Sequence, residues 1–192
     1  YNGASIAYND YDNSVYYVPG DMRARRTVGD TKSPYFFKYS ITNNNWTEIT
    51  ADRPPGQVYV GSSMTSDGTN LYLTQGNSGT TWWKYDPTAD EGSRWSSMTT
   101  TSSCSSSAGS SILYKDGTIY RTQGSGGGGT TNCKFSGGSW SSMGNIFNPI
   151  GAGSMLMDGG DGYIYLARGG NNTNYYRYDI SQSGAGSWED LS

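Results

Sequence analysis

The chain contains four copies of one short pattern, and this internal repeat limits its fold more than any other feature. The copy from Gly61 to Met98 is the clearest. It turns at Asp67-Gly68, continues through Leu71–Leu73 and then Trp82–Pro87, and closes at Trp95. Four short β-prone pieces separated by turn residues predict a four-stranded unit, which the chain repeats.

Four anchor positions recur in the same order in each copy. The tyrosines of the second piece are Tyr16, Tyr72, Tyr120 and Tyr165, and the glycines that end it are Gly20, Gly76, Gly124 and Gly169. The third pieces are Phe37-Lys38-Tyr39, Trp83-Lys84-Tyr85, Cys133-Lys134-Phe135 and Tyr176-Arg177-Tyr178. The closing tryptophans are Trp46, Trp95, Trp140 and Trp188, spaced by 49, 45 and 48 residues. These spacings are typical of propeller blades and predict units over about 3–50, 58–99, 107–143 and 151–192.

Composition favours one all-β domain. The 192 residues include 28 glycines and 17 tyrosines, and aromatic residues make up 14% of the chain, which argues against disorder. Tyr, Trp, Thr and Val favour strands, whereas Gly, Asn, Asp and Ser favour turns. No window has a sustained helical period.

The order of these anchors resembles the kelch repeat of β-propellers: a strand pair ending in glycine, an aromatic strand running into Tyr85-Asp86-Pro87, and then a tryptophan. The resemblance covers nearly the whole chain as four kelch-like blades of four antiparallel strands. The double glycine of the kelch family is complete only at Gly169-Gly170. The resemblance implies a binding platform, usually in rings of more blades, so these four can be part of a larger ring. The kelch family also includes a few copper enzymes similar to galactose oxidase.

Charge and hydropathy exclude two classes of partner. The net charge is −3, from 13 basic and 16 acidic residues, which does not fit a nucleic-acid-binding surface. No apolar run reaches the length needed to cross a bilayer. The chain starts at Tyr1 without a signal-peptide pattern, which fits a mature secreted product or an excised segment. We expect an extracellular or cell-surface protein whose Asn45 and Asn171 match the N-glycosylation pattern.

The sequence predicts no catalytic site, metal site or cofactor. Histidine is absent, which removes the commonest general base and the metal ligands that a copper-oxidase site needs. Glycoside hydrolysis needs only two carboxylates, but Asp67, Asp116 and Asp158 lie at hairpin turns, where turn hydrogen bonds explain them. The Asp158–Gly162 turn has too few oxygen ligands for calcium.

The repeated tyrosines and tryptophans are interpreted as packing between adjacent blades. Residues that break the repeat are better candidates for binding. Trp82 lies beside Trp83, and two adjacent rings in a strand point to opposite faces. We expect one ring in the core and the other exposed, as a platform on which a sugar could stack.

Two further features depart from the repeat. Cys104 and Cys133 both belong to the third unit and predict one disulfide bond, with a pair of buried free thiols as the alternative. The long loop from Asp21 to Pro34 carries Arg23, Arg25 and Arg26. It is either a solvated surface loop or a contact for a partner, a neighbouring subunit or a glycan.

Together these features predict a non-catalytic structural or protein-interaction module whose partners are other protein chains, copies of itself or surface glycans. A carbohydrate-binding propeller is the alternative, and a glycan-active enzyme is a third. Because neither terminal unit is more polar than the middle ones, we expect units one and four to be buried, against each other or against further protein.

Overall fold

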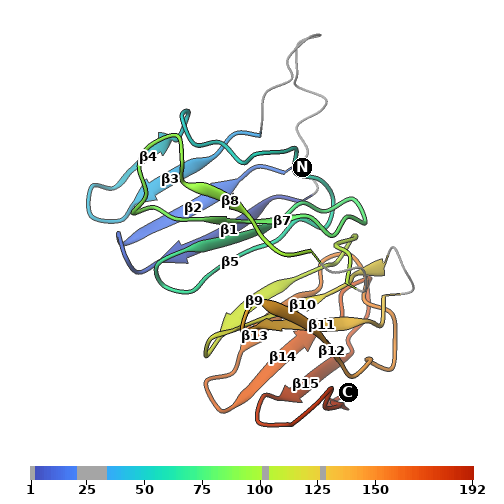
Figure 1. Cartoon of the computed structure of the whole chain (residues 1–192). Helices are drawn as coiled ribbons and strands as arrows, with labels where there is room; N and C mark the ends of the chain where they lie inside the picture. Colours follow the sequence, from blue (N-terminus) through green and yellow to red (C-terminus); the bar gives the residue numbers. More distant parts are fainter. Residues whose placement is uncertain (1–2, 21–33, 101–103, 126–128) are drawn as a thin grey trace.

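The computed structural model describes residues 3–20, 34–100, 104–125 and 129–192 (Figure 1). Every regular element in these ranges is a β-strand, and the strands form four antiparallel sheets arranged as the blades of a four-blade propeller. The predicted all-β propeller fold is confirmed. No helix in the described ranges is long and apolar enough to cross a membrane.

Each blade is a meander of four consecutive strands. Blade 1 contains β1 (Ser5–Asn9), β2 (Ser14–Val18), β3 (Phe37–Ser40) and β4 (Asn45–Glu48). Blade 2 contains β5 (Met64–Ser66), β6 (Leu71–Thr74), β7 (Trp82–Tyr85) and β8 (Trp95–Ser97). Blade 3 contains β9 (Ile112–Lys115), β10 (Thr118–Thr122), β11 (Asn132–Ser136) and β12 (Ser139–Met143). Blade 4 contains β13 (Met155–Asp158), β14 (Tyr163–Ala167), β15 (Tyr175–Asp179) and β16 (Trp188–Asp190).

Strand register places the repeated anchors at equivalent positions. Tyr39 pairs with Trp46 across β3 and β4, as Tyr85 pairs with Trp95 in blade 2. The predicted Asp116-Gly117 turn joins β9 to β10, with φ of 47° and 78°. Both values are positive, as a two-residue hairpin turn of this kind requires.

The two faces of each sheet differ in what they contact. We call the face that points to the preceding blade the leading face; in blade 2 it carries Leu73, Trp83 and Tyr85. The opposite face is the trailing face; in blade 1 it carries Tyr16 and Phe36, which pack on Tyr85.

The core consists of three hydrophobic clusters, and each lies between two consecutive blades. The first contains Tyr16, Val18, Phe36, Val58, Met64, Leu71, Leu73, Trp83 and Tyr85. The second is built on Trp82, Ile112 and Ile119. The third contains Tyr120, Met143, Ile146, Ile150, Leu156, Ile164, Leu166, Tyr176, Tyr178 and Trp188. Stability therefore comes from stacking one blade on the next, as in other repeat proteins.

The first and last blades do not close on each other. Figure 1 shows blades 1 and 2 in the upper half of the molecule and blades 3 and 4 in the lower half. Contacts run from β1 to β5, from β5 to β9 and from β9 to β13. Ile6 on β1 and Met155 on β13 are exposed. Of the two arrangements expected for units one and four, burial against each other is wrong for the single chain, and burial against further protein stays a prediction.

Candidate functional site

A cleft of about 680 Å³ lies where the first strands of all four blades meet. Its lining is rich in small and hydroxyl side chains, and the described residues that form it include no carboxylate, amine, guanidinium or thiol. Several hydroxyls are already engaged: the Ser63 Oγ accepts from the Ile112 amide at 3.2 Å, and the Ser111 Oγ accepts from the Leu156 amide at 3.0 Å. These bonds hold the first strands of neighbouring blades together. The lining formed by the described residues offers no charged group that could act as an acid or base.

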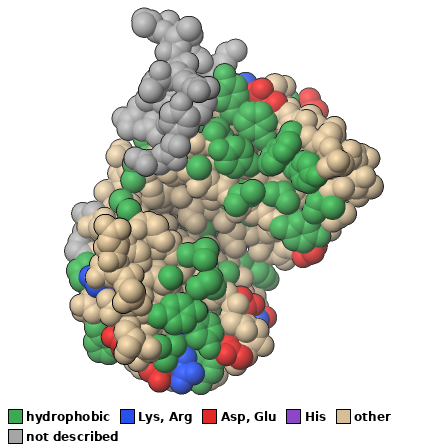
Figure 2. All heavy atoms as spheres, turned by 180° about the vertical axis from the view of Figure 1, so that it is seen from behind, with side chains coloured by type: hydrophobic (Ala, Val, Ile, Leu, Met, Phe, Trp, Pro, Cys, Tyr) green, Lys and Arg blue, Asp and Glu red, His purple; other side chains and the backbone are tan. Residues whose placement is uncertain are grey.

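The leading face of blade 1 is an exposed apolar surface of the described chain. Ile6, Tyr17 and Phe37 lie on one row across β1, β2 and β3, and Tyr39 and Trp46 extend the surface outward. Trp46 is 54% exposed, whereas Trp188 at the equivalent position of blade 4 is 4% exposed. Figure 2 shows apolar side chains at the surface of both halves of the molecule, including the half that holds blades 1 and 2. We call this surface the open leading face.

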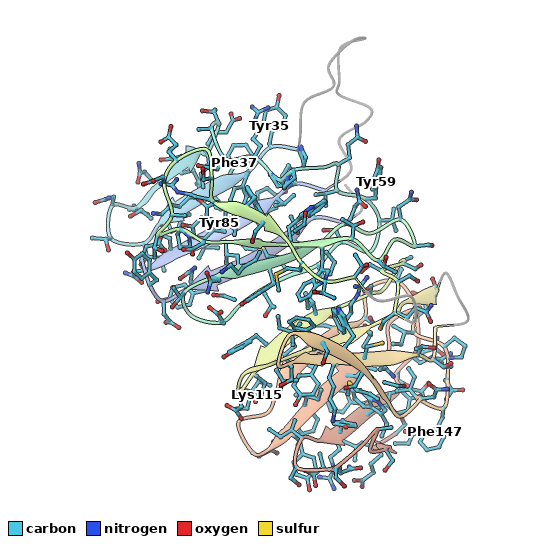
Figure 3. All side chains as sticks on the ribbon, viewed as in Figure 1. Tyr35, Phe37, Tyr59, Tyr85, Lys115 and Phe147 are labelled. Atoms are coloured by element: carbon cyan, nitrogen blue, oxygen red, sulfur yellow. The ribbon has the colours of Figure 1, made fainter. Side chains whose placement is uncertain are left out.

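Aromatic contacts order the open leading face. Tyr35 stacks on Phe37 with ring centres 6.1 Å apart, and Tyr17 contacts the rings of Phe37 at 6.3 Å and Trp46 at 6.2 Å. Figure 3 labels Tyr35 and Phe37 together on the upper half of the molecule. The rings form a continuous surface, and interface cores are enriched in aromatic residues of this kind.

Three of the four repeated tyrosines hydrogen-bond to aspartates of their own hairpin turns. The Tyr72 hydroxyl donates to Asp67 at 2.9 Å, as the Tyr16 hydroxyl does to Asp12 at 2.6 Å and the Tyr165 hydroxyl to Asp161 at 2.7 Å. Burial acts to raise the pKa of Asp67, but hydrogen bonds from Asn70, Thr69 and Tyr72 outweigh it and hold that pKa below its usual value.

Two of the repeated anchors do not pack between blades. Tyr16, Tyr72 and Tyr120 belong to the clusters between blades, but Tyr165 lies on the trailing face of blade 4, which no other blade of the described chain covers. Among the tryptophans, the Trp95 and Trp140 indole N–H groups donate to the carbonyls of Asp52 and Thr99, in the linkers between blades. Trp46 lies on the open leading face, so the packing predicted for Trp46 and Tyr165 is wrong within one chain.

Trp82 is not an exposed platform. Its side chain is fully buried between blades 2 and 3, 4.9 Å from the Phe135 ring and 5.1 Å from the Trp140 ring. The neighbouring Trp83 is buried on the opposite face, in the cluster with blade 1. The prediction of an exposed ring here is wrong because a middle blade is covered on both faces.

Cys104 and Cys133 lie together as free, buried thiols. The two side chains hydrogen-bond to each other, and the Cys104 thiol also contacts the Arg121 carbonyl oxygen at 3.6 Å. The predicted proximity is therefore present, and the two sulfurs are not bonded to each other in this structure; their oxidation to a disulfide stays a prediction. The Cys104 hydrogen bond lowers the pKa of the Cys133 thiol, while the same bond and burial raise that of Cys104.

Arg121 is a buried cation that the sequence pattern did not single out. It donates to the Gly79 carbonyl at 3.1 Å and the Ser106 hydroxyl at 2.5 Å, but its Nε and Nη1 have no partner among the described residues. Burial lowers its pKa. The position is Leu73 in blade 2 and Leu166 in blade 4, so this break in the repeat was the available signal.

The remaining candidates lie outside the described residues or at the surface. Arg23, Arg25 and Arg26 fall in residues 21–33, outside the described ranges, so their predicted contact stays a prediction. Asn45 and Asn171 are exposed, at the start of β4 and in a loop. Their glycosylation stays a prediction too. No group of three or more Cys, Asp or Glu residues in the described part of the chain is arranged to hold a metal ion.

Comparison with known proteins identifies the fold and no family. No protein-family model and no curated protein sequence matches the chain. Among solved structures, YjhT is similar over 100% of this chain and 65% of its own, at 17% identity and a TM-score of 0.65. A fungal alcohol oxidase of the AA5 family, solved with copper, is similar over 99% of this chain and 41% of its own, at 17% identity and a TM-score of 0.66.

A third similar structure is the GH74 enzyme of Niastella koreensis, which matches over 96% of this chain and 23% of its own, at 14% identity and a TM-score of 0.58. The chain therefore spans less than two thirds of the length of each of these proteins. At such identities the likeness establishes the propeller fold, which proteins of different activity share.

Proposed function

We propose that this chain is a non-catalytic, extracellular, kelch-like propeller module that works by binding protein through the open leading face of blade 1. The observation that carries the proposal is one repeat position seen four times. Ile6 is 60% exposed, whereas its equivalents Met64, Ile112 and Leu156 are 5%, 5% and 6% exposed, each covered by the preceding blade. Large exposed apolar patches usually mark association sites.

The chemistry of this face indicates the kind of partner. On the other blades, the same face is covered by the preceding blade of the same chain, which bears tyrosine and apolar side chains. In blade 2, for example, Tyr16 and Phe36 of blade 1 cover this face. A protein surface with aromatic side chains and few charges would fit the open leading face in the same way. A charged or strongly hydrated ligand would leave Ile6 and Phe37 unfavourably in contact with polar groups.

A non-catalytic role is supported by the central cleft. Its lining carries hydroxyls that hold adjacent strands together and, in the described chain, no charged group. An enzyme using this cleft would need an acid or base supplied from elsewhere. An extracellular location is supported by the two exposed sequons at Asn45 and Asn171.

A photo-crosslinking residue placed at Trp46 tests this function, with Phe147, which is 67% exposed, as the matched control position. Figure 3 places Phe147 on the lower half, far from Phe37. We expect light-dependent crosslinks to protein from position 46 that disappear when Ile6→Asp is added, and none from position 147. Glycan-array binding lost in Trp46→Ala would instead support the carbohydrate-binding alternative. Equal crosslinking from both positions would contradict the proposal.

A further inference from the structure

A glycine at the start of each inner strand marks where the next blade approaches closely. Gly3, Gly61, Gly109 and Gly153 have φ of 81°, 81°, 81° and 80°, so all four share one left-handed backbone conformation. A Cβ atom at the first three would lie 1.9 to 2.0 Å from a carbonyl oxygen in the segment just before the first strand of the next blade, at Tyr59, Ser107 and Gly151. Only glycine fits there.

Gly153 has the same backbone conformation with nothing against it. Apart from Gly153 itself and its two neighbours along the chain, no described residue has an atom within 4 Å of the position that its Cβ would occupy. The glycine is required for close approach in blades 1 to 3, and blade 4 has it where no other blade of the described chain lies against it. Blade 4 therefore presents the same docking geometry as the other three, with the space open.

The trailing face of blade 4 also carries aromatic groups at the positions that contact the next blade elsewhere. Tyr165 corresponds to Tyr16, and Tyr175 corresponds to Phe36, which packs on Tyr85 at 5.1 Å and on Trp95 at 5.4 Å. In blade 4 these two tyrosines stack on each other at 5.6 Å and 18°, and Met155 beside them is 52% exposed.

The open leading face of blade 1 supplies the complementary half. Tyr39 and Trp46 occupy the positions that Tyr85 and Trp95 occupy in blade 2. Within the chain, Tyr16 and Phe36 pack on Tyr85 and Trp95. Tyr165 and Tyr175 are equivalent to the first pair, and Tyr39 and Trp46 are equivalent to the second, so the same packing can form between them. The trailing face of blade 4 and the open leading face of blade 1 thus carry residues equivalent to those that meet between consecutive blades.

We propose that blade 4 of one copy docks its trailing face onto the open leading face of a second copy, head to tail; this inference rests on the proposed function. The contact is heterologous, so it gives a closed ring when the rotation closes and a filament when it does not. It lacks one internal feature: Met155 stands where Ser63 and Ser111 accept an amide hydrogen bond from the next blade. The contact between copies is thus weaker than those within a chain.

Two single substitutions test the contact from opposite sides. Gly153→Asn fills the open space on blade 4, and asparagine tolerates the left-handed backbone there. Its control is Gly117→Asn, at φ 78° with nothing within 4 Å, in a hairpin turn. Ile6→Asp places a charge on the open leading face, and Phe147→Asp is its control. All four variants are measured by sedimentation velocity over a concentration series, with circular dichroism to establish folding.

We expect the average mass of the unaltered protein in solution to rise with concentration. We expect each test variant to associate at least about tenfold more weakly, as is typical when an interface anchor is lost. The controls should behave like the unaltered chain. A mixture of Gly153→Asn with Ile6→Asp should form one heterodimer and nothing larger. The first variant keeps its leading face of blade 1 and the second keeps its trailing face of blade 4, so only one pair of unaltered faces can meet.

Association of Gly153→Asn at full strength would overturn the proposal, since it would mean that two leading faces pair with each other. A monomer at every concentration would also overturn it. The photo-crosslinking at position 46 would then still decide the proposed function, because crosslinks to a different protein keep that function and exclude self-association.

Discussion

The leading faces of blades 1 and 2 use the same strand positions and end in opposite environments. Both carry an apolar inner-strand residue, an aromatic pair on the third strand and a closing tryptophan. In blade 2 these groups are covered by Tyr16 and Phe36; in blade 1 no other blade of the described chain covers them. The repeat thus specifies how each face pairs, but it does not specify which chain supplies the pairing face.

The largest expected effect is a difference in unfolding free energy between alanine substitutions of two neighbouring phenylalanines, which lie on opposite faces of blade 1. Phe36 is fully buried against Tyr16, Tyr85 and Trp95, so Phe36→Ala should cost about 3–5 kcal/mol of unfolding free energy. Phe37 lies on the open leading face, and Phe37→Ala should cost about 1 kcal/mol in dilute protein. Urea denaturation measures both. Equal costs would mean that the two faces do not differ.

The thiol pair between blades 2 and 3 offers the second effect. Mild oxidation should join Cys104 to Cys133 and raise the unfolding free energy by about 3 kcal/mol, because the bond closes a long loop in the unfolded chain. The loss of two hydrogens by mass spectrometry and the melting temperature measure it, with Cys133→Ser as an oxidation-insensitive control. Thiols that remain titratable after oxidation would refute this prediction.

Arg121 makes the leading face of blade 3 unlike that of blade 2, and its replacement should bring the two closer. Arg121→Met removes a buried cation with two unpartnered nitrogens, so we expect a gain of about 1 kcal/mol in unfolding free energy. Leu73→Met at the equivalent position of blade 2 is the control and should cost less than about 1.5 kcal/mol. A loss of several kcal/mol in Arg121→Met would show that its two hydrogen bonds hold blades 2 and 3 together.

The smallest effect concerns acid. The folded pKa of Asp67 lies below its unfolded value, so its contribution is present above pH of about 4 and is lost as pH falls through the folded pKa. Because the carboxylate is partly exposed to solvent, which screens its interactions, we expect under about 1 kcal/mol. Urea denaturation of the native chain and of Asp67→Asn at neutral and acidic pH measures it. An unchanged pH dependence in the variant would exclude this carboxylate as a source.

Much of the fold could be predicted because its anchors repeat. The tyrosine, glycine and tryptophan positions defined four strands in each unit, and the register follows them. The burial of Trp82 could not be predicted by alternation alone, since a strand in a middle blade is covered on both faces. Ile6 is exposed because no other blade of the described chain covers it, and the local pattern of β1 does not encode which faces are covered. Arg121 was visible as a break at a leucine position, but only the register made that comparison available.

The most direct test of the open leading face compares Trp46 with Trp188 by hydroxyl-radical footprinting. The two residues have the same intrinsic reactivity and the same place in the repeat, but they are 54% and 4% exposed. In dilute monomer we predict rapid oxidation of Trp46 and protection of Trp188. As the concentration rises, Trp46 should become protected while Trp188 stays unchanged. Protection of Trp46 in a dilute monomer, or its full reactivity in an assembled state, would contradict the account.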